Sequence, residues 1–259
     1  MTSAARTRIA PTPSGFLHLG NAFSFALTAF MARRHGARIF LRIDDLDSQR
    51  VRRAYVEDIF DTLHFLDIPW DEGPRDYAEY QTTFSQQHRM ALYREALDGL
   101  RETGLLFACD CSRSSILRTH PQGLYTGGCL IKGLPLEELG CSWRIDTTNA
   151  ELPPEMAYFV VRKKDECPAY QLASLVDDQY FGVDLIVRGQ DLEASTQAQQ
   201  FLARVLGYRP FFDAAFHHHR LLPGPAGGKL SKSAGSTSVQ YLRQQGFRRS
   251  DCYAMIGRL

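Results

Sequence analysis

The sequence predicts an α/β fold built on a parallel sheet, and two observations carry this prediction. A strand, a turn, a helix and a second strand follow one another at the N-terminus, and strand–helix alternation returns near residue 183. The first strand is expected over 6–10, the helix over 21–34, where Gly36 ends it, and the second strand over 38–44. A helix between two strands returns the chain to the end of the sheet at which the first strand began, which favours parallel pairing.

Composition agrees with a globular protein. The chain has 259 residues, of which 44% are hydrophobic and 23% charged. No apolar run is long enough to cross a bilayer, and the first residues lack the apolar core of a secretory signal. We therefore expect a cytoplasmic, monomeric protein without a membrane partner. The net charge of +1 neither indicates nor excludes a nucleic-acid partner.

The elements after the second strand follow from periodicity and stop signals. Helical spacing predicts helices over 55–66 and 85–103, and residues 105–109 resume an extended pattern. The stretch 110–141 is rich in cysteine and glycine and has no long period. We interpret this stretch as an insertion.

Beyond the insertion, the α/β body is expected to resume. Strands are predicted over 142–146, 158–162 and 183–188, and a helix over 192–206. Residues 211–222 are extended and contain three consecutive histidines, whose side chains alternate between the two faces of a strand and cannot converge on one ion. Two short helices complete the chain.

A turn that suits an anion lies between the first strand and helix, where residues 11–21 are PTPSGFLHLGN. A helix N-terminus carries N–H groups and partial positive charge, and His18 can donate to a phosphate. Gly20 lacks a side chain and leaves room for a flat ring. A His-x-Gly alone is more typical of an ordinary turn.

A second motif is the glycine-rich loop that holds KLSKS at 229–233. Two lysines on such a loop can neutralise charge on departing pyrophosphate, although five residues alone also fit a solvated basic loop. The two motifs in this order resemble the HIGH and KMSKS signatures of class I aminoacyl-tRNA synthetases in the glutamate-specific form. Asn21 replaces the second histidine and Leu230 the methionine.

The resemblance covers nearly the whole chain, through LRIDDLD at 41–47, AYQLASLVDD at 169–178 and VRGQDL at 187–192. It implies a Rossmann-like catalytic domain in two halves, 1–104 and 146–259, separated by a zinc-bearing insertion over 105–145. Few residues follow Ser233, so we expect no anticodon-binding domain.

The resemblance also assigns residues to substrates. Arg8 and Arg188 would hold carboxylates of glutamate, Tyr170 would donate its hydroxyl, and the backbone at Ala10 and Thr12 would line the pocket. Asp44, where the family usually has Glu, would hold the amino group. ATP, with Mg²⁺, would be bound by His18, Gly20, Asn21, Lys229, Ser231 and Lys232, of which His18, Lys229 and Lys232 would be catalytic.

The reaction implied is ATP-dependent activation of glutamate to glutamyl-adenylate, followed by transfer to a tRNA. The chain is most similar to a shortened branch of the family, which transfers glutamate to queuosine in the anticodon of aspartate tRNA. A compact synthetase that charges a tRNA 3′ end keeps the same chemistry. A non-catalytic RNA-binding paralogue is the third possibility.

The cysteines of the insertion indicate one structural zinc ion. Cys109, Cys111 and Cys129 supply three soft ligands, and a closed structural site needs a fourth. Ligand softness favours Cys141, whereas the family's Tyr-x-x-x-Cys pattern favours Tyr125, which we select. Three unmetallated buried thiols are the alternative.

Overall fold

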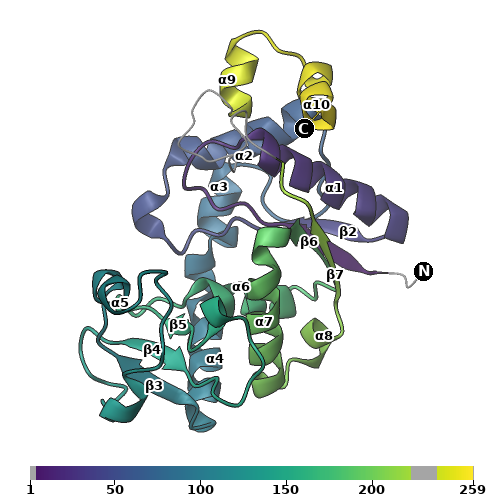
Figure 1. The fold of residues 1–259 in the computed structure, drawn as a ribbon. Helices are drawn as coiled ribbons and strands as arrows, with labels where there is room; N and C mark the ends of the chain where they lie inside the picture. Colours follow the sequence, from purple (N-terminus) through teal and green to yellow (C-terminus); the bar gives the residue numbers. More distant parts are fainter. Residues whose placement is uncertain (1–3, 223–237, 259) are drawn as a thin grey trace. The chain divides into compact units, whose positions relative to one another are not determined.

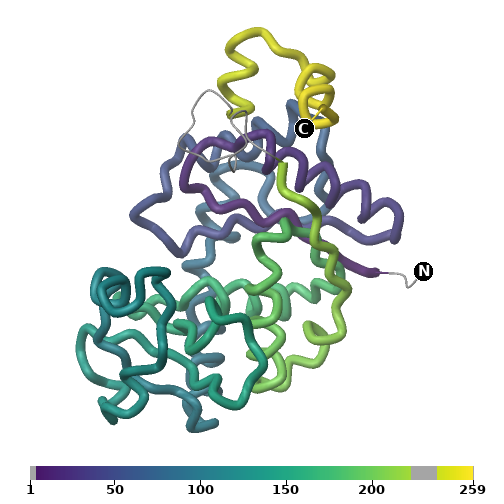
Figure 2. Tube along the Cα trace, viewed as in Figure 1, coloured from purple at the N-terminus to yellow at the C-terminus, as the bar shows by residue number. Residues whose placement is uncertain are grey.

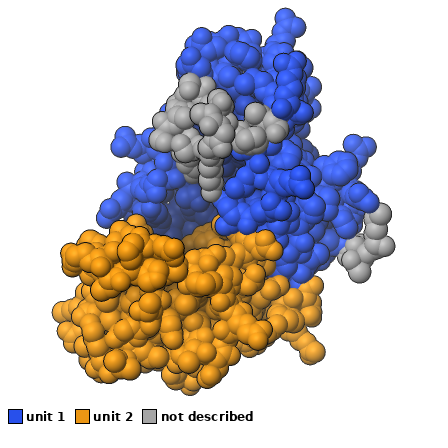
Figure 3. All heavy atoms as spheres, in the orientation of Figure 1, with its two compact units in different colours: residues 1–88, 183–191, 214–259 blue, residues 89–182, 192–213 orange. Residues whose placement is uncertain are grey.

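The computed structural model describes residues 4–222 and 238–258, which form two compact units. Unit 1 comprises residues 1–88, 183–191 and 214–259, and unit 2 comprises 89–182 and 192–213 (Figure 3). The chain therefore leaves unit 1, builds most of unit 2 and returns, so the purple and yellow ends of the trace both belong to unit 1 (Figure 2). The insertion limits at 105 and 145 stay a prediction.

Unit 1 is built on a four-stranded parallel sheet in the order β2-β1-β6-β7 (Figure 1). The predicted parallel pairing is confirmed, with Arg8 opposite Phe40 and Thr7 opposite Leu185. The strands are β1 (Arg6–Ile9), β2 (Arg38–Leu41), β6 (Leu185–Gly189) and β7 (Ala215–His219).

Helix α1 (Leu19–His35) confirms the first predicted helix, and Gly36 ends it with a φ of 71°. Leu27 and Met31 of α1 pack against Leu185 and Val187 of β6, so one face of the sheet is apolar. The other helices of unit 1 are α2 (Arg53–Leu66), α3 (Tyr77–Glu79), α9 (Val239–Gln244) and α10 (Arg249–Arg258), with 3-10 turns at Ser48–Arg50 and Gln86–Arg89 and a π turn at Tyr80–Phe84.

Unit 2 corrects one prediction. The strands expected over 142–146 and 158–162 form, but they do not extend the parallel sheet. They pair antiparallel with the strand at Leu106–Cys109 in a separate sheet of order β3-β4-β5. Alternation along a chain predicts a strand and one buried face, but it does not select the partner strand. The strands are β3 (Leu106–Cys109), β4 (Ser142–Ile145) and β5 (Val160–Arg162).

The helices of unit 2 include three that periodicity did not predict. One is α5, in the stretch expected to lack a long period, and another is α6, which holds the AYQLASLVDD block. The third is the short α8, which replaces the start of the extended stretch expected over 211–222. The set is α4 (Met90–Glu102), α5 (Arg113–Thr119), α6 (Tyr170–Tyr180), α7 (Glu193–Leu206) and α8 (Arg209–Phe212), with 3-10 turns at Leu130–Lys132, Pro154–Met156 and Gln190–Leu192. Gln190 and Asp191 belong to unit 1.

The histidine run lies in β7, where the two-residue period places His217 and His219 on one face and His218 on the other. His217 is exposed, whereas His219 is buried and its Nε2 lies 3.0 Å from the Ser24 hydroxyl of α1. This contact attaches the edge strand to α1. In the ranges that the structure describes, no helix is long and apolar enough to cross a bilayer.

Candidate active site

The turn before α1 is organised by His18, which is the N-cap of the helix. Its Nδ1 accepts hydrogen bonds from the N–H groups of Gly20 at 3.1 Å and Asn21 at 3.3 Å. The Asn21 side chain in turn accepts from the His18 N–H at 3.1 Å. Because Nδ1 is an acceptor, a neutral imidazole carries its proton on Nε2.

This arrangement changes how the turn can hold an anion. We expected the first N–H groups of the helix to face a phosphate, but those of Gly20 and Asn21 are used by His18. The histidine side chain competes for the same donors, as polar N-cap residues do. His18 Nδ1 is therefore already in use, and the predicted contact of His18 with a phosphate would have to come from Nε2.

The segment after the second motif lies against this turn. His18 and Ser238 form an antiparallel bridge, and the Val239 N–H donates to the Leu17 carbonyl at 2.8 Å. Ser238 then caps α9 by accepting from the Tyr241 N–H at 3.1 Å. Lys229, Ser231 and Lys232 lie outside the described residues, and their roles stay predictions.

Two predicted carboxylate-binding arginines share one face of the parallel sheet. Since Thr7 pairs with Leu185, the two-residue period of strands places Arg8 and Arg188 on the same side, opposite the face that packs on α1. Both are buried, with 5% and 4% of their surface exposed. The Arg8 Nη1 donates to the Val187 carbonyl at 3.2 Å, and the Arg188 guanidinium lies over the Phe216 ring.

A third arginine on this face holds Asp44. The Arg42 Nε and Nη2 donate to the two carboxylate oxygens of Asp44 at 2.7 and 3.2 Å. The Arg42 side chain is almost completely buried, so this forked pair is shielded from water. The Asp44 N–H donates to the Pro11 carbonyl at 2.9 Å, which places Asp44 beside the segment that follows β1.

The remaining predicted glutamate-binding residues are distributed between the units. Ala10 and Thr12 follow β1 in unit 1, half-buried and exposed respectively. Tyr170 is the first residue of α6 in unit 2, and 43% of its surface is exposed. It lines a cavity of about 520 Å³ within unit 2, together with Met156 and Phe159.

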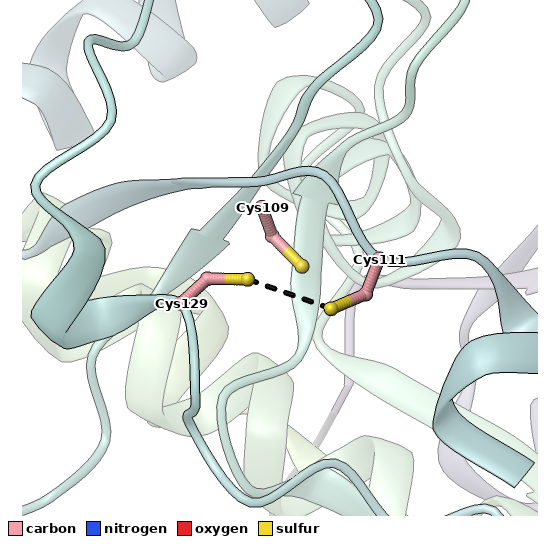
Figure 4. Close-up of side chains that lie close together, drawn as sticks. All are labelled: Cys109, Cys111 and Cys129. Atoms are coloured by element: carbon pink, nitrogen blue, oxygen red, sulfur yellow. Dashed lines mark hydrogen bonds between the residues drawn. The ribbon is translucent and has the colours of Figure 1, made fainter. Parts of the chain in front are cut away.

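The cysteine cluster is compact. The Sγ atoms of Cys109, Cys111 and Cys129 lie within 4.8 Å of one another and point toward a common centre (Figure 4). The Tyr125 hydroxyl accepts from the Cys129 N–H at 2.9 Å and is also hydrogen-bonded to Cys109. Cys141 is buried but is not part of this group.

The charges of the cluster suit a cation. Burial raises the pKa of Cys109, but hydrogen bonds from Tyr125 and the Cys111 backbone, with the charge of Arg144, bring that pKa below its usual value. Burial and the neighbouring cysteines raise the pKa of Cys111 to about 12. Burial and the same thiols also raise the pKa of Tyr125. Three thiols this close together ionise together only when a cation balances their charge. Thiolates are soft ligands that zinc prefers, so the residues present fit a zinc ion.

Sequence reasoning missed three polar residues of unit 1. Arg42 holds Asp44, and a signal existed, because opposite charges two residues apart on a strand share a face. Asp45 is buried and accepts from Tyr80, Ser85 and the Gln86 backbone. Asp58 is buried on the apolar side of α2 and accepts from the Leu17 N–H at 2.8 Å. An aspartate among apolar residues of a helix was the signal there.

The sequence matches the family described as tRNA synthetases class I (E and Q), catalytic domain, over residues 4–124 and 142–259. The chain belongs to this family, and it is therefore an enzyme of the ligase class. The stretch left unmatched, 125–141, begins at Tyr125 and contains Cys129.

Two kinds of relative are similar over most of the chain. The chain is 38% identical to Glutamyl-Q tRNA(Asp) synthetase of Symbiobacterium thermophilum, covering 92% of this chain and 81% of that protein. It is 34% identical to the glutamate–tRNA ligase of Dehalococcoides mccartyi, covering 95% of this chain and 54% of that one. The crystal structure of a glutamate tRNA ligase from Elizabethkingia meningosepticum in complex with its amino acid shares the fold, with a TM-score of 0.71 at 23% identity over 90% of this chain and 53% of that one.

Proposed function

We propose that this protein activates glutamate with ATP and transfers it to queuosine in the anticodon of aspartate tRNA. The observation that carries the proposal is the pair of buried arginines on one face of the parallel sheet, next to the turn capped by His18. Buried guanidinium groups fit the carboxylates of a dicarboxylic amino acid. Relatives that bear the glutamyl-Q name, at 38% and 37% identity, support the choice of acceptor.

In the first step, an oxygen of the glutamate α-carboxylate attacks the α-phosphate of ATP, and pyrophosphate leaves. Arg8 and Arg188 bind the carboxylates, and Asp44, held by Arg42, accepts from the ammonium group. His18 donates its Nε2–H to a phosphate oxygen, and Lys229 and Lys232 complete the charge neutralisation. Mg²⁺ bound with ATP would supply further neutralisation of the phosphates.

In the second step, a hydroxyl of the acceptor nucleoside attacks the carbonyl carbon of glutamyl-adenylate, and AMP leaves. Tyr170 supplies its hydroxyl to the bound glutamate. Anticodon loops present unstacked bases, which proteins read more readily than paired RNA. We expect the affinity for tRNA to fall with salt, because phosphate contacts release counterions.

We place the metal at the cysteine cluster, with Cys109, Cys111, Cys129 and Tyr125 as ligands. Zinc bound there would supply a structural cross-link between β3 and the segment that follows α5. No step of the reaction uses it.

The experiment that tests the proposal is transfer of labelled glutamate, with ATP, to three RNAs. These are natural tRNA that contains queuosine, and unmodified transcripts of aspartate tRNA and of glutamate tRNA. The proposal predicts label on the queuosine-containing tRNA alone. The cyclopentenediol of queuosine and the 3′-terminal ribose are both cis-diols, so retention of the label after removal of the 3′-terminal nucleotide would agree with queuosine as the acceptor.

The second candidate is charging of a tRNA 3′ end, which the 34% identity to a glutamate–tRNA ligase favours. Label on the unmodified glutamate transcript would establish this candidate and refute the first. Absence of both labels and of glutamate-dependent pyrophosphate exchange would refute both and indicate a non-catalytic paralogue.

A further inference from the structure

Asp58 is a buried carboxylate that the reaction above does not use. It lies on α2, with 2% of its surface exposed, between the core residues Val56 and Ile59. Its Oδ2 accepts from the Leu17 N–H at 2.8 Å, and its Oδ1 lies 3.5 Å from the Thr62 hydroxyl. Leu17 immediately precedes His18, so the carboxylate holds the Phe16–Leu17 peptide, one residue before the N-cap histidine.

The Leu17 backbone also contacts the segment that follows the second motif. Its carbonyl accepts from the Val239 N–H at 2.8 Å, directly after the Ser238 that pairs with His18. Asp58 and Val239 therefore bind the two peptide groups on either side of the Leu17 Cα, Asp58 at the N–H and Val239 at the carbonyl. Through these two hydrogen bonds, the Leu17 backbone connects α2 with the segment that follows residues 229–233.

Charges around Asp58 come from two elements. Asp61, one turn further along α2, is of the same sign, and Arg243 of α9 is of opposite sign, with its Nη1 3.9 Å from the Asp61 carboxylate. The turn before α1 contributes only the uncharged Leu17 N–H, which donates to Asp58. Burial is the largest influence and raises the pKa of Asp58 to about 6. The carboxylate is therefore ionised at neutral pH and loses its charge in mildly acidic solution.

We propose that Asp58 is a positioning residue for ATP binding, which acts through the Leu17 backbone to fix His18 and Ser238 relative to each other. An ionised carboxylate is a stronger acceptor than a neutral amide or a protonated acid, so the charge holds the peptide in place. The inference rests on the proposed function only in taking ATP as the ligand of this turn.

The test compares the wild type with Asp58→Asn, which retains the shape and an acceptor oxygen but has no charge. The dissociation constant of ATP with Mg²⁺ is measured by calorimetry between pH 5 and 8, with the fold checked by circular dichroism. We expect about tenfold weaker binding by the variant at pH 7.5, the effect of replacing a charge-assisted hydrogen bond with a neutral one. The ratio of the two constants should approach one below pH 6.

Titration of ATP occurs with both proteins and cancels in this ratio. Asp61→Asn is the matched control, since it removes the same charge from the same helix at a side chain that is 65% exposed. Its ratio to the wild type should stay near one at every pH. A ratio for Asp58→Asn that is near one, or that does not change with pH, would overturn the inference. Glutamate-dependent pyrophosphate exchange by the wild type tests the proposed function separately.

Discussion

Replacing Asp58 with Asn should stabilise the fold at neutral pH, although it weakens ATP binding. The pKa of this carboxyl rises from the ordinary 3.8 to about 6 in the folded protein, because burial disfavours its charge. The folded state therefore holds the proton more tightly than the unfolded state. The contribution of Asp58 to stability is complete below pH 3.8 and is lost as the pH rises through 6.

The size of this loss follows from the two pKa values. One pKa unit corresponds to about 1.36 kcal/mol, so the rise from 3.8 to about 6 is worth about 3 kcal/mol. The asparagine side chain of Asp58→Asn does not titrate, so the variant does not lose this stability as the pH rises. The difference in unfolding free energy between variant and wild type should therefore shift by about 2.4 kcal/mol in favour of the variant between pH 4 and pH 7.5, because the carboxyl of the unfolded chain is already partly ionised at pH 4.

Urea unfolding of both proteins at four pH values between 4 and 7.5 measures this difference. Packing and hydrogen-bond effects of the amide are the same at every pH. They therefore shift the plot of this free-energy difference against pH by a constant amount without changing its slope. Asp61→Asn, at an exposed position, should show a much smaller pH dependence. A difference between Asp58→Asn and wild type that is constant over this range would refute the reasoning.

Three further predictions concern other polar groups. Asp45→Asn should lower the unfolding free energy by about 1.5–3 kcal/mol in urea titrations, because Asp45 accepts from Tyr80, Ser85 and Gln86, and an unchanged midpoint would contradict this. Cys129→Ser should reduce zinc measured by atomic emission from about one ion per chain to a small fraction, whereas equal zinc content would exclude this site. Asp44→Ala should raise the KM for glutamate about tenfold or more with a smaller change in kcat. An unchanged KM would remove Asp44 from the amino-group site.

Local signals predicted the first half of unit 1 well. The bounds of β1, α1 and β2 lie within about three residues of the prediction, because strand period, turn residues and the terminal Gly36 are all encoded close together in the chain. The partners of β4 and β5 were wrong, because pairing depends on which strands meet after folding. Helix α6 was missed, since the AYQLASLVDD block was considered for its resemblance and not for its period.

The candidate site divides in the same way. The cysteine cluster was predictable from residue type and spacing, and its sulfur atoms do converge. The Arg42–Asp44 pair was missed although the strand predicted over 38–44 places both side chains on one face. Asp58 required the three-dimensional contact itself, because its partner is a backbone N–H 41 residues away in the chain.

Asp58 also shows why stability and function can be separated in this protein. A neutral asparagine at this position would fit the same space and avoid the free-energy cost of burying a charge. The carboxylate nevertheless binds the N–H of Leu17, the residue that precedes His18 and whose carbonyl accepts from Val239 after the second motif. A charge that destabilises the fold while strengthening this hydrogen bond is expected where position of the neighbouring residue matters more than stability. If Asp58→Asn proves more stable and binds ATP more weakly, both effects have one cause, the loss of a single buried charge.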